Sequence, residues 1–310
     1  MKKSKITKSV LLPLCAFAIV GSLVACNGGG NGKGQPDEYG VYADDGGPEL
    51  MIKLHTHLLD KHTNYTTYAS VNSYVQVSSR NAVSIDQYGN DASKIELFYT
   101  SKTYASTTGA SGHWNREHVW ACASSANLWT HDKSAGTHYV DGNGYTGGGS
   151  DLFHIRPCDS ELNTDRGSGK FYEFQPGDEC YEIGDKGGIY KLKVDKTGGF
   201  STKCEPANEY KGDIARILMY LYVHYSKIGD NSKYSAKVQD YLGGLNLRSV
   251  FNGNYSLDDV QKLMVKWNKL DPVSDTEKNR NNTVEKIQGN RNPFVDHPEY
   301  MARCFSIYEE

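Results

Sequence analysis

The chain has 310 residues, of which 38% are hydrophobic, and its formal net charge is −3. Residues 1–25 carry four lysines and no acidic residue, so without them the charge falls by four, to −7. This charge excludes nucleic-acid binding through a generally basic surface and restricts any such site to a local basic patch. The length accommodates one large domain or two small ones.

The first 25 residues have the pattern of a bacterial export signal. A basic start precedes an apolar run over residues 10–24, and a run of about 15 residues is short for a membrane span. The run ends in Leu23-Val24-Ala25-Cys26, which looks like a lipobox. We therefore predict a lipoprotein signal peptide over 1–25 and acylation of Cys26, which would anchor the exported protein on the outer side of a bacterial membrane. A plain secretory peptide and a membrane helix are the alternatives.

The segment 26–48 is predicted to be a tether, because it begins with a run of glycine and asparagine that cannot pack. No linker or internal repeat interrupts residues 49–310, which we predict to fold as one domain. Leucines recur at near-helical spacing from Leu50 to His62 and predict a helix. We expect its histidines, His55, His57 and His62, to be solvated or half-buried.

Strands and helices follow in a mixed order. Alternation from Lys94 to Thr100 predicts a strand, and short strands are expected between Tyr172 and Val194 around a turn at Gly187-Gly188. Helices are predicted from Asp213 to Lys227, from Ser256 to Leu270 and from Asp275 to Gln288. The first would begin at Asp213 as its N-cap, the second at a capping box and the third would stop at Gly289. Residues 288–298 are predicted to be extended loop.

Five cysteines follow Cys26. Export permits disulfides, and the pairs Cys180 with Cys204 and Cys122 with Cys158 are plausible. An odd thiol remains, which includes Cys304 among the candidates. None shows C-x-x-C spacing, which argues against a thiolate zinc site.

The central stretch carries the chemistry. Five histidines fall between positions 113 and 154: His113, His118, His131, His138 and His154. The order of residue types from 114 to 167 predicts a strand, a long loop over 121–150, a second strand and a helix. Loops of this length in compact domains are usually functional or disordered.

Three explanations of this histidine density remain open from the residues alone. Three histidines could hold a hydrolytic zinc ion, although the helical H-E-x-x-H pattern is absent. A phosphodiesterase site with one hard cation would need a histidine base, oxygen ligands such as Glu117 and Asn163, and a cation against the phosphate. Arg116, Arg156 and Arg166 are the candidates for that cation. The histidines could also be merely structural.

A family resemblance favours the second explanation. The sequence Trp-Asn-Arg-Glu-His-Val-Trp at 114–120, with Asp-Leu-Phe-His-Ile-Arg-Pro at 151–157 and Asn-Thr-Asp-Arg-Gly at 163–167, resembles the bacterial endonuclease I family. The resemblance continues at residues 212–216, 271–274 and 288–298 and covers roughly residues 95–300 in order. The family usually has proline after the second tryptophan, where this chain has Ala121.

The resemblance implies an α+β fold in which a ββα-metal (His-Me finger) core is surrounded by helices and short strands over 49–310. It implies that His118 is the general base and that Glu117 and Asn163 bind a single Mg²⁺, which Ca²⁺ or Mn²⁺ could replace. It also implies a sequence-nonspecific endonuclease that leaves 5′ phosphates on extracellular DNA, with RNA as a further substrate. No protein partner is implied, and the lipid anchor makes the membrane the other partner.

Weaker assignments surround this set. Arg156 and Arg166 are expected to contact phosphate, with an ion pair to Asp151 or Asp159 as the alternative for Arg156. His154 would orient a neighbour or pack between strand and helix. Trp114 and Trp120 are expected to pack rather than to stack on bases. The lysines of the predicted helix over 256–270 are expected to form a solvated face: Lys262, Lys266 and Lys269.

Two other functions remain as alternatives. One is a zinc-dependent hydrolase of another ester. The other is a surface lipoprotein that binds nucleic acid without cleaving it.

Overall fold

A computed structural model describes residues 35–75, 84–100, 102–105, 114–121, 147–183, 191–196, 201–228, 242–243 and 245–307. All of them belong to one compact unit, which spans Gly34–Glu310. The unit Met1–Lys33 lies outside the described residues, and with it the predicted signal peptide, the lipobox and Cys26. Within the described part of the chain, no helix combines the length and the apolar character needed to span a bilayer.

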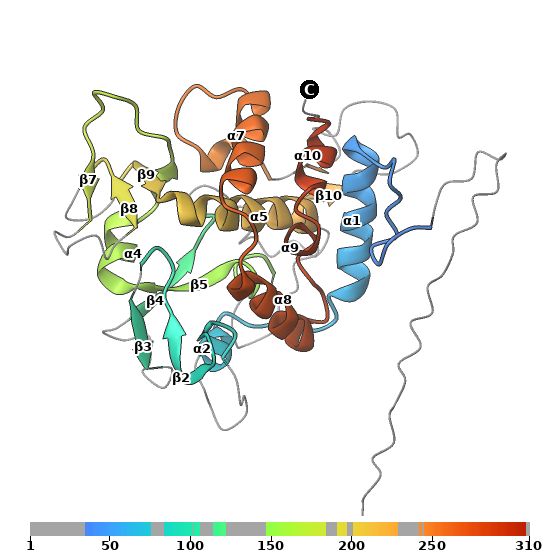
Figure 1. Ribbon diagram of the computed structural model, residues 1–310, viewed down its shortest axis with the longest axis horizontal. Helices are drawn as coiled ribbons and strands as arrows, with labels where there is room; N and C mark the ends of the chain where they lie inside the picture. The colour runs from blue at the N-terminus through green and yellow to red at the C-terminus, as the bar shows by residue number, and fades with distance from the viewer. Residues whose placement is uncertain are drawn as a thin grey trace, which may run out of the picture. The chain divides into compact units, whose positions relative to one another are not determined.

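The fold is α+β, with helices around several small sheets. Helix α5 (Asn208–Tyr225) runs through the middle and packs against α1 (Gly47–Lys61), α7 (Leu257–Leu270) and α9 (Pro293–Asp296) (Figure 1). Its side chains are buried on nearly all sides, as expected for a helix inside a core.

Helix α5 begins earlier than predicted, because its first residue is Asn208 and its N-cap is Ala207. Asp213 lies inside the helix, where its carboxylate accepts a hydrogen bond from Arg216 at 3.1 Å. Arg216 also donates to Glu277 at 2.7 Å and to Asn268 at 3.0 Å. This buried guanidinium therefore ties α5 to α7 and to the next helix of the chain.

The C-terminal helices follow their sequence signals closely. Helix α7 begins with a capping box between Ser256 and Asp259, as predicted. Helix α8 (Asp275–Gln288) begins with a second capping box and ends at Gly289, which has the left-handed φ of 90°. The prediction of extended loop over 288–298 is wrong in part, because Asn292 caps the short helix α9, and α10 (Tyr300–Phe305) follows.

Residues 39–45, which were predicted to belong to the tether, pack against the C-terminal helices. Tyr39 and Val41 are buried, and the Tyr39 hydroxyl donates to Asp296. Arg303 of α10 donates to the carbonyl oxygens of Tyr42 and Asp45 at 2.6 and 2.8 Å. The predicted boundary after residue 48 is therefore too late, since the aromatic and apolar residues at 39–42 find partners on the C-terminal helices.

The sheets are small. In one, β1 (Gln87–Tyr88), β2 (Asp91–Glu96) and β3 (Thr103–Ala105) are antiparallel, so the predicted strand at 94–100 begins earlier and ends at Glu96. A second sheet has the order β6-β9-β8-β7. Its strands are β6 (Lys170–Phe171), β7 (Tyr181–Glu182), β8 (Leu192–Val194) and β9 (Lys203–Pro206). A separate two-stranded sheet consists of β10 (Lys227–Ile228) and β11 (Leu242–Gly243). The turn predicted at Gly187-Gly188 lies outside the described residues.

Two further helical segments are short: α2 (Val71–Val75) and the 3₁₀ helix η3 (Leu247–Val250).

The cysteines of the described chain are thiols. Cys158, Cys180, Cys204 and Cys304 are free. The plausible pairing of Cys180 with Cys204 is therefore wrong, and Cys122, the plausible partner of Cys158, lies outside the described residues. Burial raises the pKa of the Cys204 thiol to about 11 and disfavours its reactive thiolate.

Of two glycines that have a left-handed backbone, only one lacks room for a Cβ atom. Comparing alanine substitutions at the two positions separates the cost of backbone strain from the cost of steric overlap. Gly289 has φ of +90°, and a Cβ there would lie 2.6 Å from the carbonyl oxygen of Lys61. Gly177 has φ of +96° and open space around it. We expect Gly177→Ala to lower the free energy of unfolding by about 1–2 kcal/mol through the backbone alone. Gly289→Ala should cost about 1–3 kcal/mol more, because the methyl group overlaps backbone. Urea unfolding of both variants measures the difference, and equal losses would contradict the proposed overlap.

Candidate active site

Two antiparallel strands and a helix frame the site. Strand β4 (Trp114–His118) pairs with β5 (Ile155–Asp159), and α4 (Ser160–Arg166) follows directly. Asp159 caps α4 by accepting a hydrogen bond from the amide of Glu161 at 3.0 Å. The predicted order of strand, connection, strand and helix is thus confirmed, and β4 ends at His118, where alternation along the strand no longer constrains the side chains.

The His118 ring is held on three sides. Its Nε2 lies 2.9 Å from the carbonyl oxygen of Gly149. The Tyr68 ring stacks on it with centroids 5.6 Å apart and an interplanar angle of 24°. The His154 ring meets it edge-on at 5.2 Å. Two separate segments, the turn at Tyr68 and the stretch from Gly149 to His154, therefore fix the orientation of this imidazole.

The contact with Gly149 fixes the tautomer of His118. A carbonyl oxygen only accepts hydrogen bonds, so Nε2 carries the proton and Nδ1 carries the lone pair of the neutral ring. Burial lowers the pKa of His118 to about 4, against a smaller opposing effect of the hydrogen bond to Gly149. The ring is therefore neutral near pH 7, in the form that can accept a proton.

His154 orients the turn that holds His118. Its Nδ1 lies 2.6 Å from the carbonyl oxygen of Gly148, and its Nε2 accepts a hydrogen bond from the Trp120 amide at 3.0 Å. Burial lowers the pKa of His154 to about 3, so the ring is neutral and both contacts persist. The residue both orients its neighbours and packs between the elements, so the two expectations for it are compatible.

Glu117 and Arg166 form a buried ion pair. Arg166 Nη1 lies 2.7 Å from Glu117 Oε1, and both side chains are at most 2% exposed. The guanidinium also donates to the carbonyl oxygens of His118 at 3.1 Å and Val119 at 2.9 Å. Arg166 thus faces the end of β4, and for it to contact phosphate it would have to leave these partners.

Glu117 presents a buried carboxylate to a cation. Burial raises the pKa of its carboxyl group to about 7 even though the Arg166 charge opposes the shift. Because Oε1 lies against the Arg166 guanidinium, a divalent cation bound here would share the carboxylate with Arg166. The added positive charge would stabilise the charged form of the carboxyl group.

Asn163 approaches the same strand end from α4. Its Nδ2 donates to the carbonyl oxygen of Arg116 at 3.4 Å, one residue from Glu117. The carboxamide oxygen remains for a cation, and carboxylate plus amide oxygen is a donor set that suits Mg²⁺. Asn163 therefore lies against the β4 backbone one residue before Glu117 and two before His118.

Arg156 lies apart from this group in its contacts. It pairs with Glu117 along the β4–β5 register, but its Nε donates to Asp86 at 3.2 Å and its guanidinium lies over the Phe98 ring. It lines a cavity of about 360 Å³ whose other walls carry carboxylates: Glu96, Glu209, Asp213 and Asp271. Acidic walls disfavour a phosphate there, and the acidic partner is Asp86 rather than Asp151 or Asp159.

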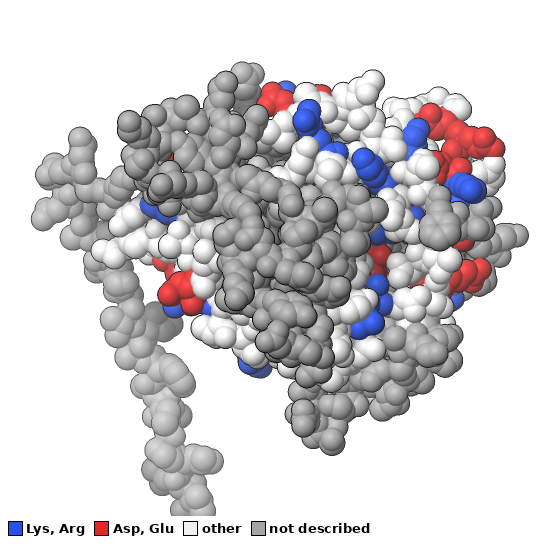
Figure 2. Space-filling model, turned by 180° about the vertical axis from the view of Figure 1, so that it is seen from behind, with Lys and Arg blue, Asp and Glu red and all other residues white. Residues whose placement is uncertain are grey.

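The other described residues singled out in the sequence are buried in the core or lie beside acidic side chains. Trp114 and Trp120 are fully buried, so they pack as predicted. Lys262 lies 3.9 Å from Asp258 and Lys266 lies 2.8 Å from Glu173, in keeping with a solvated face. Figure 2 shows one face of the molecule, where the coloured lysines and arginines are interspersed with acidic side chains. His113, His131 and His138 lie outside the described residues.

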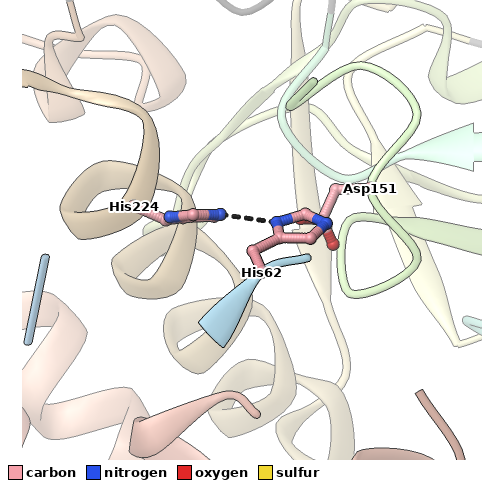
Figure 3. A group of neighbouring side chains, drawn as sticks. All are labelled: His62, Asp151 and His224. Carbon is pink, nitrogen blue, oxygen red and sulfur yellow. Dashed lines mark hydrogen bonds and ion pairs between the residues drawn. The ribbon is translucent and has the colours of Figure 1, made fainter. Parts of the chain in front are cut away.

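A second group of ligand-type side chains lies in the core. His62, Asp151 and His224 are buried, and one nitrogen or oxygen atom of each lies within 4.8 Å of the others. In Figure 3, His224 points from α5 at the ring of His62, which lies in front of Asp151. His62 Nδ1 is 2.7 Å from His224 Nε2 and 4.0 Å from Asp151 Oδ2.

The contacts of this group are those of a hydrogen-bonded network. Asp151 Oδ2 accepts from the Tyr220 and Tyr225 hydroxyls at 2.7 and 2.6 Å, and Oδ1 accepts from the Phe153 amide at 2.7 Å. Two nitrogens bound tetrahedrally to one zinc ion would lie about 3.3 Å apart, farther than the pair found here. A metal would therefore have to displace the tyrosine hydroxyls and separate the two rings.

Sequence reasoning missed the surroundings of three residues at these sites. His55 and His62 are buried and hydrogen-bonded, not solvated or half-buried, because α1 packs its C-terminal half against α5. Tyr68 was not singled out, and its place against His118 comes from a turn about 50 residues earlier in the chain. Only the polar character of these segments was visible in the sequence, and it does not reveal such long-range contacts.

Comparison with known proteins identifies relatives. A family model described as Endonuclease I matches residues 48–299. The chain is 34% identical over 218 residues to a protein named extracellular ribonuclease from Bacillus subtilis (strain 168), a match that covers 69% of this chain and 62% of that protein. The protein of the same name from Bacillus amyloliquefaciens is 33% identical with the same coverage. Endonuclease-1 from Buchnera aphidicola subsp. Baizongia pistaciae is 29% identical over 147 residues, 47% of this chain and 46% of that protein.

The buried histidine pair should make the fold sensitive to acid. Burial, with smaller contributions from His62 and His55, holds the pKa of His224 well below its usual value. The unfolded chain therefore binds a proton below about pH 6.5 that the native state refuses, and stability present above that pH is lost as the pH falls. His224→Gln should lessen this loss between pH 7 and pH 5 by up to about 1.4 kcal/mol per pH unit.

Denaturant unfolding at several pH values measures the effect, with His297→Gln as the control. His297 is partly exposed, and hydrogen bonds to Glu38 and Glu299 outweigh burial and raise its pKa. Its contribution is present below the unfolded pKa and lost as the pH rises, so the control should not lessen the loss in acid. Equal acid slopes for the parent and His224→Gln would contradict the prediction.

Proposed function

The chain belongs to the endonuclease I family, as its sequence motifs predicted, and from this premise we propose that it is a Mg²⁺-dependent, sequence-nonspecific endonuclease. It hydrolyses phosphodiester bonds of extracellular DNA, and of RNA, to products with 5′ phosphates. The name of the Bacillus relatives, extracellular ribonuclease, supports RNA as a substrate and export as the route. The chain spans 62% of the length of these relatives. Their activity is therefore assigned to it only as part of this proposal.

The observation that carries the proposal is the contact of His118 Nε2 with the Gly149 carbonyl oxygen at 2.9 Å. This contact directs the lone pair to Nδ1, which takes the proton from the attacking water. The Tyr68 and His154 rings hold the imidazole, so the ring has little orientational freedom left to lose when the substrate binds. A base fixed in this way contributes about 10²–10⁴ to the rate.

Glu117 and Asn163 would hold the cation in this ββα-metal core. The Glu117 carboxylate, which Arg166 also contacts, and the amide oxygen of Asn163 fit a hard cation that keeps several waters. Bound Mg²⁺ supplies positive charge for the phosphate and for the leaving 3′ oxygen. Arg166 positions the Glu117 carboxylate and the β4 backbone from α4, and it acts through these contacts rather than on the phosphate.

A cleavage assay separates this function from its alternatives. The purified protein is incubated with linear DNA, circular DNA and RNA, each with Mg²⁺, Zn²⁺ or EDTA. We expect cleavage of both circular and linear DNA with Mg²⁺ and none with EDTA. Activity restored by Zn²⁺ alone would favour a zinc hydrolase, and binding without cleavage would favour a nucleic-acid-binding lipoprotein.

The His118→Ala variant tests the base directly. Its cleavage rate should fall about 10²–10⁴-fold because water is no longer deprotonated. Circular dichroism of the variant controls for folding. A folded variant that degrades plasmid DNA as fast as the parent would show that His118 is not the base.

Export and anchoring form a separate part of the proposal. Acylation at Cys26 would hold the enzyme on the outer side of the membrane, because two or three acyl chains give durable anchoring. In a bacterial host, Cys26→Ser should move the protein from the membrane fraction to the soluble fraction, as measured by immunoblot. A variant that stays fully in the membrane fraction would rule out lipid anchoring through Cys26.

A further inference from the structure

The three arginines considered for the phosphate differ in their partners. Arg156 pairs with Asp86, and Arg166 pairs with Glu117. Both guanidinium groups are buried against a carboxylate, although Arg156 shares Asp86 with Arg280. Arg116 is half-buried, and no carboxylate of the described residues pairs with it. Its charge is therefore the one that remains available to an anionic ligand.

Arg116 is held beside the base. Its Nη1 donates to the Tyr68 carbonyl oxygen at 2.7 Å, and its guanidinium carbon lies 3.7 Å from the centroid of the Tyr68 ring. The same ring stacks on His118. Arg116 and His118 are two residues apart on β4, and their contacts with this one ring place both side chains beside Tyr68. The other guanidinium donors remain for a ligand, since the carbonyl contact uses only Nη1.

The segment that carries Tyr68 is fixed to the turn that orients His118. Thr66 Oγ1 donates to the Ser150 carbonyl oxygen at 2.7 Å, and Ser150 Oγ donates to the Thr66 carbonyl oxygen at 2.8 Å. Ser150 follows Gly149, whose carbonyl oxygen accepts from His118. One short turn thus sets the orientation of the base and, through Tyr68, the position of the guanidinium.

We propose that Arg116 is the arginine that contacts the backbone phosphate of the substrate, and that Tyr68 is a positioning residue for both Arg116 and His118. The inference rests on the proposed function and names the cation of that site. A planar guanidinium can bind a phosphate through two parallel hydrogen bonds, and its stacking on tyrosine reduces the freedom lost on binding. In a chain of net negative charge, such a local cation supplies what the overall charge does not.

Binding measurements test Arg116 without cleavage. Fluorescence anisotropy of a labelled DNA duplex, in the His118→Ala background with EDTA, gives Kd at several salt concentrations. Arg116→Met should weaken binding about 10- to 100-fold, the loss expected for one hydrogen bond to a charged group. It should also reduce the slope of log Kd against log salt by about 0.9, the value for one phosphate contact. Arg116→Lys should keep the slope, and Lys262→Met, on the exposed face of α7, should change neither.

Tyr68 is tested in the active enzyme. Tyr68→Leu should raise KM and lower kcat, because both the guanidinium and the imidazole lose the ring that holds them. Tyr68→Phe keeps the ring and should restore most of both values, which a role of the hydroxyl group would not allow.

The outcomes separate the two proposals. A parent that cleaves DNA while Arg116→Met keeps the salt slope and affinity overturns the assignment of Arg116 alone. The same holds if Arg116→Met lowers only the thermal stability. A parent that neither binds nor cleaves nucleic acid overturns the proposed function and this inference with it.

Discussion

The buried ion pair between Glu117 and Arg166 joins the end of β4 to α4, and the candidate site depends on it. Removing two charges from water is costly unless the pair is close and its remaining donors are satisfied. Arg166 meets part of this condition, because its Nη1 and Nη2 also donate to the carbonyl oxygens of His118 and Val119. The same guanidinium therefore fixes a carboxylate and the backbone of the neighbouring histidine. Removing only one partner would leave an uncompensated charge in the core.

Much of this site could be predicted from the sequence because its parts are local. Glu117 and His118 are adjacent, and Asn163 and Arg166 lie one helical turn apart on α4, so a strand and a short helix suffice to present them. The capping box of α7 and the glycine stop of α8 were equally local, and they were found at the predicted residues. In contrast, the start of α5 was misjudged because Asp213, a good cap by type, serves Arg216 inside the helix.

The parts that could not be predicted depend on contacts between distant segments. His62 and His224 are 162 positions apart, and nothing in either neighbourhood indicates that the rings meet. Tyr68 reaches His118 only because Thr66 and Ser150 bind each other across 84 positions. The buried state of Glu117, which makes its carboxyl group a weak acid, likewise follows from packing. Residue types therefore indicate which chemistry to expect, while the tertiary structure determines how each group is held.

The contacts of residues 37–45 with the C-terminal helices have a mechanical consequence. The Tyr39 hydroxyl donates a hydrogen bond to Asp296, and the Tyr300 hydroxyl donates one to Asp37. Arg303 donates to the carbonyl oxygens of Tyr42 and Asp45. Tension applied through the N-terminal end of the described chain would reach these bonds before it reached β4 or α4. The C-terminal helices would thus bear the applied force. A protein held at its N-terminus could be pulled without distorting its candidate active site.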